Sequence, residues 1–152
     1  MTPLVLDTNI VLDVFVFADE AALPLKDELL GGRLRWFATA EMRDELERVL
    51  AYPQIVPRLA LRGLAATDVL AAFDRHATPV ECAPKAPVTC KDPDDQKFID
   101  LAVRERAMLL SKDAAVLSMR KRLEALGAGA GPEWLQPRHP RGGGDPVLPS
   151  GS

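Results

Sequence analysis

The chain has 152 residues, of which 47% are hydrophobic and 27% are charged, and its formal net charge is −3. These values suit one globular domain with a real core, and the negative charge argues against broad, nonspecific adhesion to nucleic acid through a basic surface. No apolar stretch reaches the length of a membrane span, and Met1 leads almost directly into a strand pattern rather than a secretory signal, so we expect a cytoplasmic protein without a membrane partner.

The first half of the chain alternates short apolar runs, which predict strands, with longer stretches that carry helix caps and helical spacing of apolar residues. In chain order we expect a strand at 4–6, a helix at 10–17, a helix that begins at Pro24 and ends at Gly31, a strand at 34–38, a helix from Thr39 to about Leu50, and helical structure over 54–77 with a break near Gly63 and a new cap at Thr67.

The second half continues this alternation after a proline-rich connection. Asp92 resembles a helix N-cap, because Pro93 then occupies the first helical position. In chain order we expect a weakly marked strand at 80–82, a stiff loop at 83–93, a helix from Asp92 to about Arg106, a strand at 108–110, and one long helix from 114 to 126 that Gly127 closes.

The short strands lack polar and apolar alternation, which is typical of a parallel sheet covered by helices on both faces. We therefore predict an α/β domain with three layers, α/β/α, over residues 1–135. Residues 136–152 contain almost nothing to bury, and we expect a disordered C-terminal tail there.

Two of the expected strands run into acidic residues. Asp7 follows the first strand and Asp113 follows the strand at 108–110. If these strands are parallel neighbours, both carboxylates reach the carboxyl edge of the sheet, where ligands gather in such folds. Either residue alone is as readily a helix cap.

Two helices supply further acids. Asp95 lies in the first turn of its helix, and Phe98 and Ile99 follow at offsets of three and four, which places Asp95 on the inward face. Its neighbour Asp94 points elsewhere and is at most a supporting residue, while Asp92 is interpreted as a cap. Glu45 lies at the border of the buried stripe of its helix, which selects it over the other acids there.

Three or four carboxylates brought together repel one another, so the cluster needs a divalent cation to neutralise it. Carboxylate oxygens without histidine or thiolate suit Mg²⁺ or Mn²⁺. Cys82 and Cys90 lack a CxxC spacing and the histidines are His76 and His139, so a zinc site of the usual composition cannot be assembled locally. We expect both cysteines to be reduced.

Four strings in order carry a family resemblance: VLDTNIVLD at 5–13, AEMRDELERVLAYP at 40–53, CKDPDDQKFIDLA at 90–102 and LLSKDAAVL at 109–117. Over about residues 3–135 the chain resembles a PIN domain, specifically the bacterial and archaeal PIN proteins that are toxin components of toxin–antitoxin pairs. The resemblance implies a sheet of four or five parallel strands, frequent homodimers, and cleavage of single-stranded RNA assisted by one or two Mg²⁺ or Mn²⁺ ions. It also implies a cognate antitoxin that covers the acidic groove.

By this resemblance the metal-binding and catalytic carboxylates are Asp7, Glu45, Asp95 and Asp113, with Thr8, Asn9 and Ser111 as supporting polar residues. Asp94 joins the supporting residues because of its position beside Asp95. Residues 85–122 carry nine Lys or Arg against six Asp or Glu, whereas residues 1–84 carry eight against thirteen. The candidates for phosphate contacts from this basic segment are Lys91, Lys97, Arg104 and Lys112, although charge alone favours solvated helix faces.

Other readings fit less well. A haloacid-dehalogenase-like phosphatase would have a second Asp where this chain has Asn9, and a receiver domain would have an acidic pair before Asp7. A dinucleotide-binding domain would have a GxGxxG turn after the first strand. The serious alternative is a catalytically idle PIN domain that binds RNA or a protein partner, since a fold does not fix activity.

Overall fold

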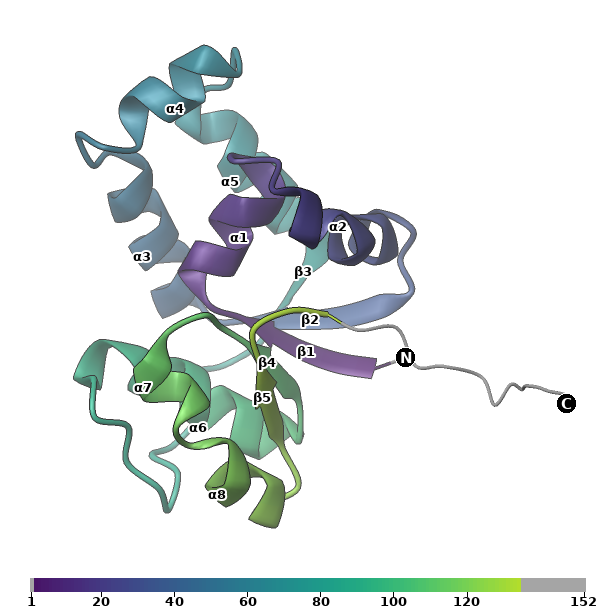
Figure 1. The fold of residues 1–152 in the computed structure, drawn as a ribbon, viewed down its shortest axis with the longest axis vertical. Helices are drawn as coiled ribbons and strands as arrows, with labels where there is room; N and C mark the ends of the chain where they lie inside the picture. Colours follow the sequence, from purple (N-terminus) through teal and green to yellow (C-terminus); the bar gives the residue numbers. More distant parts are fainter. Residues whose placement is uncertain (1, 135–152) are drawn as a thin grey trace, which may run out of the picture.

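Five parallel strands form the central sheet of the computed structural model, which describes residues 2–134 (Figure 1). The strands are β1 (Thr2–Leu6), β2 (Leu34–Ala38), β3 (Ala77–Pro79), β4 (Met108–Leu110) and β5 (Gly129–Gly131), in the spatial order β3-β2-β1-β4-β5. Leu6 pairs with Leu110 in the register of β1 and β4. Because these central strands are parallel and end together, the residues after them meet at one edge of the sheet.

The helices cover both faces of this sheet, as expected for three layers. They are α1 (Thr8–Phe15), α2 (Leu23–Leu30), α3 (Ala40–Leu50), α4 (Val56–Leu61), α5 (Ala66–His76), α6 (Gln96–Glu105), α7 (Ala114–Leu117) and α8 (Arg120–Ala125), with 3-10 turns η1 (Glu20–Ala22) and η2 (Pro93–Asp95). Helices α1 to α5 lie on one face and α6 to α8 on the other (Figure 1). Such segregation follows from right-handed crossovers that run outward in both directions from β1.

Burial on both faces explains the uninterrupted apolar character of the central strands. Successive side chains of a strand point to opposite faces, and Leu4 and Val5 are both 0% exposed. Trp36 of β2 is also buried and packs edge-on against Phe73 of α5, with 5.0 Å between ring centroids. The predicted strands at 4–6, 34–38 and 108–110 are confirmed within β1, β2 and β4.

Several helix boundaries are also confirmed. Pro24 lies in the first turn of α2, and Gly31 follows its last residue. Thr39 is the N-cap of α3, where its Oγ1 accepts a hydrogen bond from the backbone N–H of Met42 at 3.4 Å. This cap starts the helix that carries Glu45. Among the described helices none is long and apolar enough to cross a membrane.

Two boundaries in the middle of the chain differ from the prediction. The third strand is Ala77–Pro79 rather than 80–82, because the chain becomes extended directly after α5, and only the N–H of Val80 continues the pairing by donating to the carbonyl of Ala38. Thr67 is not a cap but lies inside α5. The N-cap is Ala65, whose N–H donates to the carboxylate of Asp68 at 2.8 Å.

The last part of the domain contains two further differences. The single helix predicted at 114–126 is divided into α7 and α8 at Met119, which has φ −95° and ψ 1° and a fully buried side chain. Strand β5 was not predicted, since its sequence Gly-Ala-Gly carries no strand signal. The helix that starts after Asp92 begins with the 3-10 turn η2. The tail expected at 136–152 lies outside the described residues.

Candidate active site

Asp7 occupies the centre of the site, between the end of β1 and the start of α1. Its backbone N–H donates to the carbonyl of Leu110 at 3.0 Å, which ties it to the end of β4. Its Oδ1 accepts the backbone N–H of Asn9 at 3.1 Å, so it also caps α1. The side chain is 5% exposed, and this burial is the main cause that raises its pKa, against the lowering effect of its hydrogen bonds.

Ser111 links the two central strand ends. Its fully buried hydroxyl donates to Oδ2 of Asp7 at 2.6 Å and accepts the backbone N–H of Asp113 at 3.0 Å. Asp113 in turn caps α7, since its Oδ1 accepts the N–H of Ala115 at 2.9 Å. The hydroxyl of Ser111 therefore joins the carboxylate of Asp7 to the backbone of Asp113. Both acids lie at the same edge of the sheet, as their positions after neighbouring strands predicted.

Asp95 reaches the same place from the other side of the sheet, at the start of α6. It is 8% exposed, and its Oδ2 is buried without a hydrogen-bond partner. Burial, a hydrogen bond with Asp113 that favours the protonated form, and the charges of Asp7, Asp113 and Asp92 raise its pKa to about 8. A buried polar atom without a partner is costly and uncommon in folded proteins.

The oxygens available here fit a divalent cation. One carboxylate oxygen from each of Asp92, Asp95 and Asp113 lies within 4.8 Å of the other two. Asp7 adds a carboxylate close enough to raise the pKa of Asp95 through its charge. Mg²⁺ and Mn²⁺ prefer such hard oxygen donors, and an ion would give the unpartnered Oδ2 of Asp95 the positive partner that no described residue supplies.

Glu45 lies on α3 at the border of this cluster, and its charge contributes to the raised pKa of Asp7. Its Oε2 accepts the hydroxyl of Thr8 at 2.6 Å, and its Oε1 pairs with the ammonium of Lys97. Glu45 is not one of the three residues whose oxygens approach one another closely. The structure thus brings all four predicted carboxylates to one edge but gives Glu45 different partners.

The supporting residues divide into buried and exposed ones. Thr8 and Ser111 are buried and bond to carboxylates of the site. Asn9 is exposed and contributes its backbone N–H. Asp94 is exposed too, and its carbonyl accepts the ammonium of Lys97 at 2.6 Å.

The four basic candidates also occupy different environments. Lys97 lies at the border of the carboxylate cluster, in its ion pair with Glu45. Lys91 is exposed and directly precedes Asp92 in the chain. Arg104 lies toward the other end of α6 and pairs with Glu105 at 2.9 Å. Lys112 pairs with the buried carboxylate of Asp13 at 2.5 Å.

Asp92 and Asp13 are the acids that sequence reasoning did not place in or beside the site. Asp92 does cap η2, with its Oδ1 accepting the N–H of Asp94 at 3.0 Å, but it also faces Asp95 and Asp113. Its spacing of three from Asp95 was the available signal, because residues three apart share one side of a helical turn. Asp13 offered no signal, since its partner is 99 positions away in the chain.

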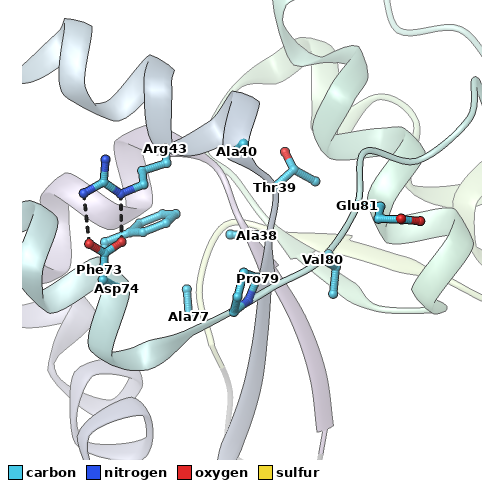
Figure 2. A pocket seen from close by; sticks show the side chains of 10 residues that line it. All are labelled: Ala38, Thr39, Ala40, Arg43, Phe73, Asp74, Ala77, Pro79, Val80 and Glu81. Carbon is cyan, nitrogen blue, oxygen red and sulfur yellow. Dashed lines mark hydrogen bonds and ion pairs between the residues drawn. The ribbon is translucent and has the colours of Figure 1, made fainter.

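A separate apolar hollow of about 500 Å³ lies beside β3, at the ends of β2 and α5 (Figure 2). Phe73 and Val80 are among its lining residues, and Arg43 and Asp74 pair across one side at 2.7 and 2.9 Å. None of the carboxylates proposed to bind metal lines this hollow. The acidic cluster therefore is a polar site distinct from this apolar hollow.

A family model and one solved structure agree with this architecture. A family model described as "PIN domain" matches residues 3–115, whereas no curated protein matches the chain. The crystal structure of VapBC2 from Rickettsia felis, bound to a DNA fragment from their promoter, contains a chain with a TM-score of 0.56 and 11% identity, covering 86% of this chain and 98% of that one. A PilT N-terminus domain protein from Sulfolobus solfataricus P2 has a TM-score of 0.43 and 18% identity, with 86% of each chain covered. With its parallel sheet and a family match over most of its length, the chain belongs to the PIN domain family.

Proposed function

We propose that this protein is a metal-dependent endoribonuclease that cleaves single-stranded RNA, and that it is the toxin of a toxin–antitoxin pair. The observation that supports catalysis best is the buried, unpartnered Oδ2 of Asp95 inside a group of carboxylates. Burying like charges without a cation costs free energy. Members of the PIN family are generally nucleases, and a group of carboxylates that fits a divalent ion supports metal-assisted hydrolysis.

The protein's own residues orient the acidic groups. Ser111 and the N–H of Asn9 leave Asp7 little rotational freedom, and the N–H of Ala115 holds Asp113. Asp92, Asp95 and Asp113 would hold a Mg²⁺ or Mn²⁺ ion, which would lower the pKa of a bound water and so supply a hydroxide nucleophile at neutral pH. Such a nucleophile would make a covalent intermediate on the protein unnecessary, and the site residues described contain no Ser–His or Cys–His pair that would form one.

The proposal of an antitoxin partner is supported by the similarity to a chain of VapBC2 and by the resemblance of the motifs. We expect a small protein encoded beside this one to cover the acidic groove and to bring a basic side chain to the carboxylates. The two proteins should co-purify, and overexpression of this chain alone should slow growth. If the proteins do not co-purify and growth is not slowed, the toxin assignment is contradicted, while the nuclease assignment stays intact.

Cleavage of a labelled single-stranded RNA pool tests the nuclease. We expect fragments with Mn²⁺ or Mg²⁺, none with EDTA, and none with Asp7→Asn or Asp95→Asn. A matched control is Asp44→Asn, because Asp44 is exposed on α3 next to Glu45 and lies outside the cluster. Full-rate cleavage by Asp7→Asn would contradict the proposed site, and RNA binding without cleavage by the wild type would support the idle alternative.

A further inference from the structure

We infer that Lys97 is a built-in cation of this site, held beside Glu45, so that the site takes one divalent metal ion rather than two. The inference rests on the proposed function, since it concerns how many ions the carboxylates bind. In this view Glu45 pairs with the ammonium group of Lys97, and the aspartates alone bind the metal ion.

Both carboxylate oxygens of Glu45 already have partners. Oε1 pairs with Nζ of Lys97, and Oε2 accepts the hydroxyl of Thr8 at 2.6 Å. A metal ion at Glu45 would have to displace one of these groups. The side chains of Lys97 and Glu45 are only 20% and 19% exposed, which shields the pair from water far more than the 49% exposed Lys112. Charge pairs shielded in this way are screened less by salt than exposed pairs.

The ammonium of Lys97 is held by more than one contact. It also donates to the carbonyl oxygen of Asp94 at 2.6 Å. Lys97 is the second residue of α6, and Asp95 is the N-cap of the same helix. The start of one helix therefore supplies both a carboxylate for the ion and a positive charge held by two contacts.

The oxygens that can close around an ion form a separate group. Asp92, Asp95 and Asp113 are the described residues whose carboxylate oxygens come within 4.8 Å of one another, and the unpartnered atom belongs to Asp95. Two-metal hydrolases place their ions about 3.5–4 Å apart and share carboxylates between them. Here a second ion would need the carboxylate of Glu45, which is already paired with the ammonium of Lys97.

Electrostatics makes this substitution reasonable. Five carboxylates meet at this edge of the sheet: Asp7, Glu45, Asp92, Asp95 and Asp113. One divalent ion offsets part of their negative charge. The ammonium of Lys97 offsets a further part, and as a residue of the chain it does not have to be bound from solution. An ammonium is a compact point charge that suits a phosphate oxygen, so Lys97 also supplies positive charge toward a phosphodiester bound across the site.

Mn²⁺ binding by the purified full-length chain tests this inference, with isothermal titration calorimetry and electron paramagnetic resonance as readouts. We expect one ion per wild-type chain. Lys97→Met should raise the number to two, because Glu45 then becomes available, and Lys97→Arg should keep it at one. Lys121→Met is the matched control, since Lys121 is exposed on α8, and it should also bind one ion.

A second pair of variants makes the test independent of how well Lys97→Met folds. Glu45→Gln should still bind one Mn²⁺ ion, whereas Asp95→Asn should bind none. Three results would each overturn the inference: two ions bound by the wild type, unchanged binding by a folded Lys97→Met protein, or loss of the ion in Glu45→Gln. If the wild type still cleaves RNA in these cases, the proposed function stands without the inference. A wild type that binds no Mn²⁺ would instead overturn the metal-dependent function and the inference with it.

Discussion

Asp95 is the residue whose chemistry depends most on its surroundings. Its pKa rises from the ordinary value of 3.8 to about 8, first because of burial and then because of the carboxyl group of Asp113 and the charge of Asp7. In the folded protein without metal this carboxyl therefore holds a proton at neutral pH, whereas in the unfolded chain it is ionised. Between these two pKa values the folded state binds more protons than the unfolded state.

The sign of the pH dependence follows from that difference in bound protons. The free energy of unfolding in EDTA should fall as the pH rises from 6 to 8, because unfolding releases the proton that Asp95 holds in the folded state and a higher pH favours that release. Asp95→Asn removes this ionisation, and we expect it to be more stable than the wild type by roughly 1–2 kcal/mol at pH 8, in the range of other stabilising substitutions. Urea unfolding at both pH values measures the effect.

The exposed Asp44→Asn variant is the control for this experiment, and it should keep the wild-type pH dependence. Equal stability of the wild type at pH 6 and pH 8, with Asp95→Asn no more stable, would show that the carboxyl of Asp95 is ionised normally in the folded protein.

At the scale of elements, the connection from α8 to β5 places the last strand beside β4. Gly127 has φ +86°, a left-handed conformation that side chains with a Cβ adopt at a cost. Strand β5 then pairs with β4, and the carbonyl of Gly131 accepts the N–H of Ser111 at 2.9 Å. This turn therefore helps to place the hydroxyl that bridges Asp7 and Asp113.

Replacing Gly127 by Ala tests the importance of that turn. We expect a loss of about 1 kcal/mol in the free energy of unfolding, because the backbone is strained while the added Cβ meets only ordinary contacts, the nearest being Arg106 at 3.5 Å. Gly131→Ala is the matched control, since its Cβ would meet nothing within 4 Å and its φ is not positive, and we expect no loss. Thermal and chemical denaturation compare the two, and an equal effect would contradict the argument.

At the scale of the whole molecule, the site joins segments that are far apart in the chain. The end of β1, the middle of α3, the start of α6 and the end of β4 all contribute to it. Hydrogen bonds such as that from Ser111 to Asp7 span 104 positions, and that from Thr8 to Glu45 spans 37. An ion bound by these segments exists only in the folded state, so its binding free energy stabilises the fold.

Metal addition should therefore raise the melting temperature. At a Mn²⁺ concentration about 100 times the Kd, binding contributes about 2.7 kcal/mol, which corresponds to a rise of roughly 5–10 °C for a domain of this size. The rise should be larger at pH 8 than at pH 6, because protons compete with the ion for Asp95. Differential scanning calorimetry at matched ionic strength measures it, and an unchanged melting temperature at pH 8 would contradict metal binding at this site.

Local sequence by itself determined most of the elements and the identity of the central acids. Apolar runs located β1, β2 and β4, caps such as Thr39 located helix starts, and the position of Asp7 and Asp113 after parallel strands predicted that they meet. The strands and caps depend on neighbours along the chain, whereas the meeting of Asp7 and Asp113 also required the prediction that their strands are parallel neighbours. The expected carboxylates Glu45 and Asp95 do lie at the same edge.

Tertiary structure alone decided the features that depend on packing between distant segments. Strand β5 exists because β4 offers an unpaired edge to a Gly-Ala-Gly segment that has no strand propensity of its own. The pairing of Lys97 with Glu45 and of Lys112 with Asp13 depends on which helix faces which strand end. Burial of Asp95 sets its pKa, and burial is a property of everything packed around a residue rather than of its neighbours in sequence.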